Sequence, residues 1–162
     1  MEKNKNKLSK SMNISLTAVF ASLYAVSVIV LAPISFGPIQ IRIADALIPL
    51  SIIYGYPVVI GVTLGNVIAN IYGGFGFIDI VGGTLANLLA SYSAFKLRRH
   101  TILACISAAL IIGIIVGTYL GYILSIPSEF TIISITFSSL ISITIIGYTL
   151  VTLLKQRILL NE

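Results

Sequence analysis

Seven polar or charged side chains interrupt the apolar stretches of this chain and have the chemistry to bind a polar ligand. They are Arg42, Asp45, Asn66, Asn70, Asp79, Asn87 and Glu129. Carboxylates accept hydrogen bonds, a guanidinium donates them, and amides do both. Where such groups lie within a bilayer they are costly, about 2.5 to 3.5 kcal/mol for a charge at a helix centre, so they usually face a cavity or a partner.

Each of these residues also has a purely structural interpretation. Arg42 and Asp45 are three residues apart and could pair with each other. Asp79 could be a first-turn acid that interacts with a helix dipole. Amides on neighbouring helices often bond to each other, at a gain of about 1 kcal/mol. The alternative is a polar pocket between helices. Its substrate-binding residues would be Arg42, Asp45, Asn66, Asn70, Asp79 and Asn87. Glu129 fits a solvated loop.

The same sequence lacks the groups that most enzymes need. Its glycine-rich stretches have no Gly-Lys-Ser/Thr ending, so no P-loop for ATP is present. A single histidine, His100, and a single cysteine, Cys105, make a zinc or haem site improbable. No Ser/His/Asp set can be assembled. We therefore predict a binding protein with no catalytic residue, no metal and no cofactor.

Composition places the chain in a membrane. Of its 162 residues, 57% are hydrophobic and 9% charged, and the mean hydropathy is +1.07, whereas soluble domains carry about 25% charged residues. One crossing takes about 20 residues, which leaves little chain for a soluble domain. The net charge of +5 is gathered in terminal and loop clusters, a pattern that indicates membrane orientation and not nucleic-acid binding.

The apolar runs and their breaks predict an all-α, polytopic membrane protein with six transmembrane helices. The expected helices are roughly 14–32, 45–56, 57–72, 79–95, 101–124 and 130–154, within a membrane domain of residues 13–157. Residues 1–12 are expected to be a disordered basic N-terminus and residues 158–162 a short tail. With both termini cytoplasmic, nine of the ten Lys and Arg lie inside and only Arg42 lies outside, as the positive-inside tendency requires.

Three alternatives accompany this topology. The first apolar run could be a secretory signal peptide, although its 19 residues exceed the usual core of about 7–15. Merging the second and third helices would give five crossings but would move one basic cluster outside. The pattern Gly-x-x-x-Ala-Asn, at 65–70 and again at 82–87, fits close helix packing through small residues better than an inverted transport repeat.

Two segments resemble the QueT family of queuosine-precursor transporters. They are Ile39–Leu47, which reads IQIRIADAL, and Ala69–Ala86, which reads ANIYGGFGFIDIVGGTLA. The resemblance extends over roughly residues 14 to 95. Where the family usually has Ser-Glu after Arg-Ile, this chain has Ala44-Asp45, so the acid is kept but is one methylene shorter. Residues 100–162 carry no motif that matches.

The resemblance implies a substrate-binding S component of an energy-coupling factor (ECF) importer, with six helices in the plasma membrane. It implies a 7-deazaguanine ligand such as preQ0 or preQ1. Asp45 or Asp79 would make a bidentate contact to the base, with Asn70 at the base edge and Arg42 orienting the external loop. An S component for another vitamin-like ligand, or a membrane scaffold subunit, remains the alternative.

The resemblance also implies protein partners. S components dock through small residues of their first helix on a shared transmembrane coupling subunit, and two ATPase subunits on other chains supply the energy. The candidates here are Ala18 with Ser22 and Ala21 with Ala25, although small residues four apart are common in membrane helices.

Overall fold

The computed structural model describes residues 9–36 and 40–160, and this part of the chain is helical with no strand. The predicted all-α class is therefore confirmed. The predicted tails lie mostly outside the described residues, but α1 already begins at Lys10 and α8 continues to Leu160. In chain order the elements are α1 (Lys10–Val30), α2 (Ala32–Ser35), η1 (Ile43–Leu50), α3 (Ser51–Tyr54), α4 (Tyr56–Gly73), α5 (Phe77–Lys96), α6 (Thr101–Leu124), α7 (Ser128–Ser139), η2 (Leu140–Gly147) and α8 (Tyr148–Leu160).

The first helix packs directly against α4 through two glycines. A Cβ on Gly61 would lie 2.8 Å from the Thr17 carbonyl oxygen, and a Cβ on Gly65 would lie 2.5 Å from that of Ala21. Any larger residue would push the helices apart, so these glycines set the α1–α4 spacing. The Gly65 pattern thus belongs to close helix packing, as the simpler interpretation expected.

The second predicted helix is shorter and less regular than expected. Residues 43–50 form a 3₁₀-helix, η1, and only Ser51–Tyr54 is α-helical before the break at Gly55, where φ is +68°. Pro49 lies inside η1 and supplies no backbone donor. At a rise of about 2.0 Å per 3₁₀ residue and 1.5 Å per α residue, this unit spans about 22 Å, less than a hydrocarbon core of about 30 Å.

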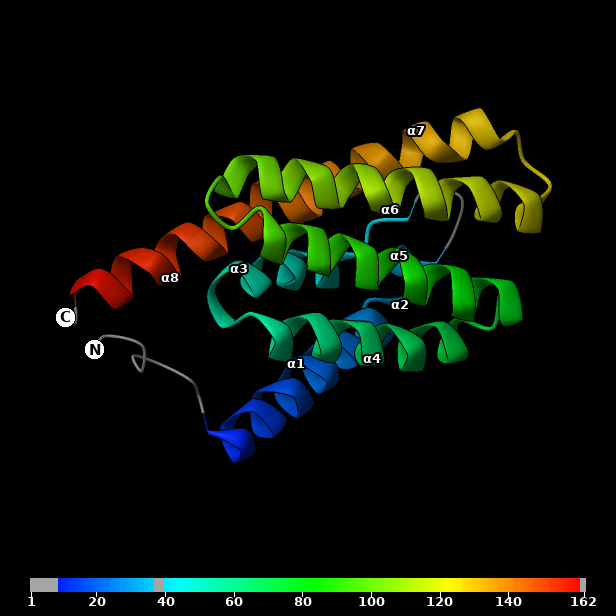
Figure 1. Cartoon of the computed structure of the whole chain (residues 1–162). Coiled ribbons are helices and arrows are strands. Elements are labelled where there is room, and N and C mark those ends of the chain that lie inside the picture. The colour runs from blue at the N-terminus through cyan, green and yellow to red at the C-terminus, as the bar shows by residue number, and fades with distance from the viewer. Residues whose placement is uncertain (1–8, 37–39, 161–162) are drawn as a thin grey trace.

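Successive helices run back and forth, so that their turns gather at two ends of the bundle (Figure 1). The start of α1, the α3–α4 and α5–α6 turns and the end of α8 lie at one end. The α4–α5 and α6–α7 turns lie at the other. Lys155 Nζ on α8 donates to Thr101 Oγ1 at the start of α6 over 2.8 Å, so the mid-chain and C-terminal basic residues share the first end.

The last predicted crossing is one long helical segment with a change of winding in its middle. Here α7 and α8 are joined by η2, a π-helical stretch of eight residues packed beside η1. Gly147 ends this stretch, and a Cβ there would lie 2.8 Å from Pro49 Cγ and 3.0 Å from the Ala46 carbonyl oxygen. The absence of a side chain at 147 therefore lets η1 approach the last helix.

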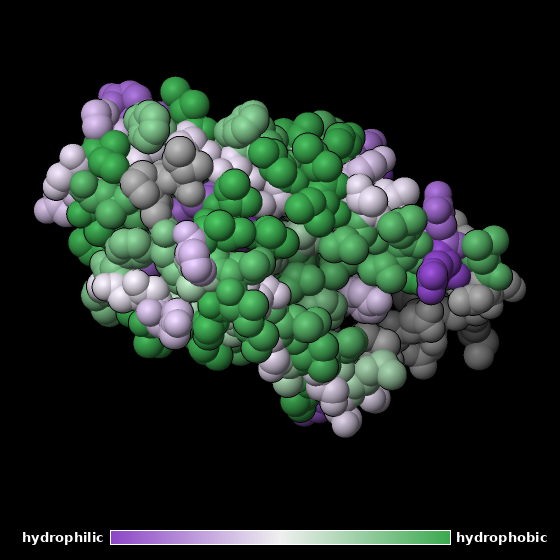
Figure 2. Space-filling model, turned by 180° about the vertical axis from the view of Figure 1, so that it is seen from behind, coloured by the Kyte–Doolittle hydropathy of each residue, from purple (hydrophilic) through white to green (hydrophobic). Residues whose placement is uncertain are grey.

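Within residues 9–36 and 40–160, four helical segments are long and apolar enough to cross a membrane. They are Lys10–Val30, Tyr56–Gly73, Thr101–Leu124 and Ser128–Ile158. The 20-residue α5 is not among them, since Asp79, Asn87 and two serines lower its hydropathy. Many large apolar side chains are exposed on these helices, and Figure 2 shows apolar residues over the middle of one face with hydrophilic residues mostly toward its ends. Such a surface suits lipid and not water.

Candidate ligand-binding site

The structure brings all six predicted binding residues and two tyrosines into one buried group, which we call the polar cluster. The members are Tyr24, Arg42, Asp45, Asn66, Asn70, Asp79, Asn87 and Tyr119. They come from α1, η1, α4, α5 and α6 and the residue that precedes η1. The six predicted residues are each at most 8% exposed. Glu129, by contrast, is exposed at the start of α7 and takes no part.

The side-chain hydrogen bonds of Arg42 go to α4. Its Nη1 donates to Asn66 Oδ1 over 2.9 Å and its Nη2 to Asn70 Oδ1 over 2.8 Å. The two asparagines are one helical turn apart, so one guanidinium reaches both. The hydrogen bonds of Arg42 therefore go to the asparagines and not to Asp45, the partner that the structural interpretation suggested. Whether Arg42 orients the external loop stays a prediction.

Tyr24 is the centre of the network. Its hydroxyl donates to Asp45 Oδ1 over 2.6 Å, lies 3.3 Å from Asn66 Oδ1, and accepts a bond of 2.8 Å from Asn87 Nδ2. The side chain is wholly buried. Its hydroxyl thus links the first helix to η1 and to the middle of α5.

Asp79 anchors the other side of the cluster. Its Oδ1 accepts a 2.9 Å bond from the Tyr119 hydroxyl of α6, and its backbone carbonyl accepts a 2.9 Å bond from Asn70 Nδ2. The residue is in the first turn of α5, which agrees with the predicted favourable position at a helix N-terminus. Asp79 is also completely buried, so its side chain lies inside the bundle and not in a solvated loop.

Four polar atoms of the cluster have no hydrogen-bond partner among the described residues. They are Arg42 Nε, Asn66 Nδ2, Asp79 Oδ2 and Asn87 Oδ1. Buried polar atoms are nearly always paired, because each unpaired one costs about 1–3 kcal/mol. Two donors and two acceptors are thus free in one cluster, where a polar ligand or a water molecule could pair with them.

Two small cavities border the cluster, each of about 10 Å³. One is lined by Gln40, Ile135 and Ser139 and the other by Tyr24, Gly83 and Asn87, and Arg42 and Asp45 line both. Each has space for about one water molecule. A fused-ring ligand is several times larger, so the cluster has to open before such a ligand enters.

Aromatic residues lie next to Arg42. Its guanidinium carbon is 5.5 Å from the centre of the Phe36 ring, and this ring is 6.0 Å from that of Phe75. The Phe36 ring also packs closely against the backbone of Gly73 at the end of α4. These rings cover Arg42 near the α4–α5 turn.

The predicted docking residues divide into two groups. Ala18 and Ser22 are exposed on α1. Ala21 is half-buried against α4, and Ala25 is 5% exposed and lies inside the bundle. Ala25 therefore has almost no surface free to meet a partner, and docking through the four small residues stays a prediction.

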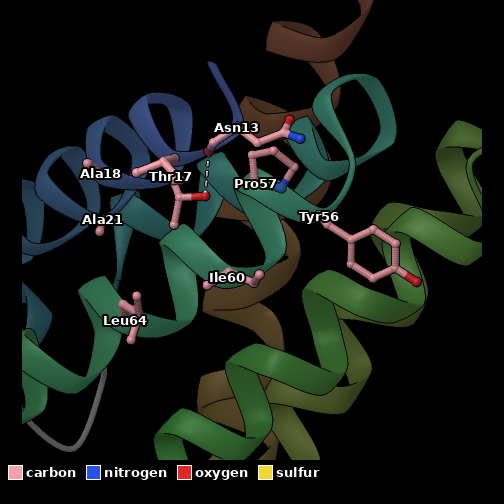
Figure 3. A pocket seen from close by; sticks show the side chains of 9 residues that line it. Asn13, Thr17, Ala18, Ala21, Tyr56, Pro57, Ile60 and Leu64 are labelled. Carbon is pink, nitrogen blue, oxygen red and sulfur yellow. Dashed lines mark hydrogen bonds between the residues drawn. The ribbon is translucent and has the colours of Figure 1, made fainter. Parts of the chain in front are cut away.

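Ala18 and Ala21 line an apolar groove with a volume of about 520 Å³ between α1 and α4 (Figure 3). Ile60 and Leu64 of α4 form its opposite wall, and Tyr56 and Pro57 close one end. The groove is on the outside of the bundle and is separate from the polar cluster.

Sequence reasoning missed Tyr24 and Tyr119. Tyrosine is enriched at membrane interfaces, so no spacing marked these two. The one signal was the position of Tyr24, which lies in the interior of a predicted helix and not at its end. A hydroxyl buried in the interior needs a hydrogen-bond partner. Among the described residues no group of three or more His, Cys, Asp or Glu could hold a metal ion.

These features define a helical protein with several segments apolar enough to cross a membrane and with a closed polar site between its helices. The model of the QueT transporter family matches residues 14–156, and the chain belongs to that family. QueT proteins are ECF S components for queuosine precursors; they bind small molecules and work with ECF modules. The match extends the predicted resemblance of residues 14–95 into the second half. No curated protein and no solved structure matches the chain.

Proposed function

We propose that this protein is the S component of an ECF importer that binds a 7-deazaguanine precursor of queuosine, such as preQ0 or preQ1, in the polar cluster. The observation that carries this proposal is the set of four unpaired atoms on Arg42, Asn66, Asp79 and Asn87 inside a buried network. A scaffold subunit whose polar residues only hold helices together would gain by pairing every one of them.

The chemistry of the cluster suits such a base. A guanine-like ring system carries N–H donors, which carboxylate and amide oxygens accept, and a carbonyl, which guanidinium and amide N–H groups bind. Asp45 and Asp79 supply the carboxylates, and Asn66 and Asn70 supply amides from α4. The nearby Phe36 and Phe75 add apolar ring surface. The proposed role of these residues is binding, and no catalytic residue is assigned.

The site would open to the outside of the cell. Asn70 is three residues before the end of α4 and Asp79 is two residues after the start of α5, so the cluster is in the half of the bundle next to the α4–α5 turn. Six crossings with both termini cytoplasmic put this turn outside and the basic residues Lys96, Arg98 and Arg99 inside. In this arrangement η1 and α3 form one short crossing of the plasma membrane, and the bilayer thins around this unit because it is shorter than the hydrocarbon core.

Transport would require separate subunits. The groove between α1 and α4, together with the exposed Ala18 and Ser22, is the proposed docking surface for the transmembrane coupling subunit. Small residues let another helix approach closely. Two ATPase subunits would supply the energy, since this sequence has no P-loop.

The test is the melting temperature of the detergent-purified protein in the presence of preQ0, preQ1, queuine, guanine and a panel of vitamins. A ligand that binds only the folded state adds about 2.7 kcal/mol at a hundredfold excess over its dissociation constant. We expect stabilisation by a deazaguanine alone. Stabilisation by a vitamin instead would assign a different ligand to the S component, and a flat panel from folded protein would favour the scaffold.

A further inference from the structure

The groove between α1 and α4 runs inward from the end of the bundle where α1 starts and the α3–α4 turn lies (Figure 1). Its lining begins at Asn13 and Tyr56 and ends at Ala21 and Leu64. On each helix this is eight residue steps, a rise of about 12 Å. One leaflet of a bilayer has about 15 Å of hydrocarbon, half of the core of about 30 Å. An apolar groove of this length fits one acyl chain that enters from the membrane surface.

The first turn of α1 puts a cation at the surface end of the groove. Lys10 is exposed and lies three residues before Asn13 and four before Ile14, both of which line the groove. Residues three and four apart share a helix face, so Lys10 continues the groove face of α1 toward the water. A lysine stem extends along an apolar surface while its ammonium group stays at the interface.

A second cation reaches the same end through two stacked rings. Tyr56 is 54% exposed, and its ring turns from the groove toward α5 (Figure 3), where its centre is 5.0 Å from that of Phe95. The Arg98 guanidinium carbon is in turn 5.1 Å from the centre of the Phe95 ring. A guanidinium on an aromatic face keeps its charge and its N–H groups for an anion. The stack therefore holds a phosphate-binding group beside the start of α4.

The described acidic residues lie away from this end. Glu129 is at the start of α7 and Asp79 at the start of α5, both next to turns at the opposite end of the bundle, and Asp45 is buried in the polar cluster. Among the residues that the structure describes, no carboxylate lies at the end that holds Lys10 and Arg98. These two cations can therefore bind an anion from the membrane surface.

We propose that the groove binds one anionic phospholipid, with an acyl chain between α1 and α4 and the phosphate between Lys10 and Arg98. An anionic lipid is favoured over a zwitterionic one, because each basic side chain near the surface attracts the negative headgroup. In the proposed topology this end is cytoplasmic, and the cytoplasmic leaflet carries the anionic lipid. The lipid occupies the groove of the free protein, and a coupling subunit that docks there has to displace it. That displacement rests on the proposed function, whereas lipid binding is a property of this chain alone.

The test compares the dissociation constants of two lipids by native mass spectrometry of the full chain purified in detergent. The lipids are dioleoyl phosphatidylglycerol and dioleoyl phosphatidylcholine, which share their acyl chains and differ in headgroup charge. We expect phosphatidylglycerol to bind at least about tenfold more tightly, and equal binding would overturn the role of the two cations. Glycerophosphate, which has the anion without the chain, should not compete at the same concentration. Competition by glycerophosphate would indicate a simple anion site and overturn the lipid.

Charge variants locate the headgroup. Lys10→Gln combined with Arg98→Gln should reduce the preference for phosphatidylglycerol to less than about threefold. Arg99→Gln combined with Arg157→Gln removes the same charge from exposed positions at the same end and should leave the preference unchanged. If both pairs reduce the preference equally, a general basic surface attracts the lipid and the site at Lys10 and Arg98 is refuted.

A second pair of variants locates the acyl chain. Ala18→Phe places a ring in the groove and should weaken binding of both lipids at least about tenfold. Ser22→Phe adds the same ring to an exposed position of α1 outside the groove and should weaken neither. An Ala18→Phe protein with full lipid affinity would refute the chain contact. Because these measurements use this chain without the transported ligand, their failure leaves the proposed import function standing, and failure of the ligand panel leaves the lipid site standing.

Discussion

Tyr24→Phe removes one oxygen atom from the middle of the polar cluster and tests whether the cluster holds the bundle together. The change abolishes the 2.6 Å bond to Asp45 and the 2.8 Å bond from Asn87. The ring itself keeps its place, because Phe has the same shape. What is lost is one hydrogen bond to a charged group, about 1.5–3 kcal/mol, and one between neutral groups, about 1 kcal/mol.

We therefore expect Tyr24→Phe to lower the free energy of unfolding by about 2 to 4 kcal/mol. The assay is reversible unfolding in mixed micelles of increasing dodecyl sulfate fraction, followed by circular dichroism. Tyr122→Phe is the matched control, since Tyr122 is 78% exposed and its loss should change stability by less than about 0.5 kcal/mol. Equal effects of the two variants would refute the view that the Tyr24 hydroxyl joins α1 to the cluster.

Three further predictions follow from the packing, the groove and the topology. Gly65→Leu should destabilise the protein by several kcal/mol, because even a Cβ there would lie 2.5 Å from the α1 backbone, whereas Leu64→Ala at the exposed neighbouring position should cost under about 1 kcal/mol in the same micelle unfolding assay. Ala18→Trp should abolish co-purification with the coupling subunit while leaving ligand-induced thermal stabilisation unchanged; loss of both would indicate misfolding. In a background without the native cysteine, Glu129→Cys should react with an impermeant maleimide on intact cells, and Arg98→Cys should react only after permeabilisation; the reverse pattern would contradict the proposed orientation.

Much of the helical framework could be predicted, because a segment that crosses a membrane has to be a long apolar helix. Apolar runs and their Gly and Pro breaks are visible in the sequence, and the predicted 101–124 matches the bounds of α6. The breaks at Gly55 and Gly74 adopt positive φ, which glycine allows. The second segment was less predictable, because whether residues 43–50 wind as an α-helix or a 3₁₀-helix depends on tertiary contacts such as that between Pro49 and Gly147.

Six of the eight members of the polar cluster could be predicted from the sequence, but their hydrogen-bond partners could not. Arg42, Asp45 and the asparagines stand out because polar groups in apolar helices need partners. Their pairing depends on which helices are neighbours, and a spacing of three residues suggested Arg42 with Asp45, whereas Arg42 reaches across to α4. Tyr24 is marked in the sequence only by its position inside a predicted helix, and the fold is needed to show that its side chain is buried among polar partners.

The docking residues show the same limit. Small residues four apart on α1 indicate a close approach, but not by which neighbour. The structure uses Ala21 against Gly65 of α4 and leaves Ala18 and Ser22 exposed. Intramolecular packing and partner docking have the same pattern in the sequence, because both need only a flat helix surface.

The central claim is that a deazaguanine binds at the polar cluster, and calorimetric titration of preQ1 tests it most directly. Asn70→Leu removes the Asn70 bonds to Arg42 and to the Asp79 carbonyl. Asn13→Leu is the control, since Asn13 lies at the start of α1, lines the groove and is not a member of the polar cluster. We predict one site per chain in the parent protein and in Asn13→Leu, and binding at least about tenfold weaker in Asn70→Leu. Unchanged affinity in a folded Asn70→Leu protein, or no heat of binding in the parent, would contradict the account.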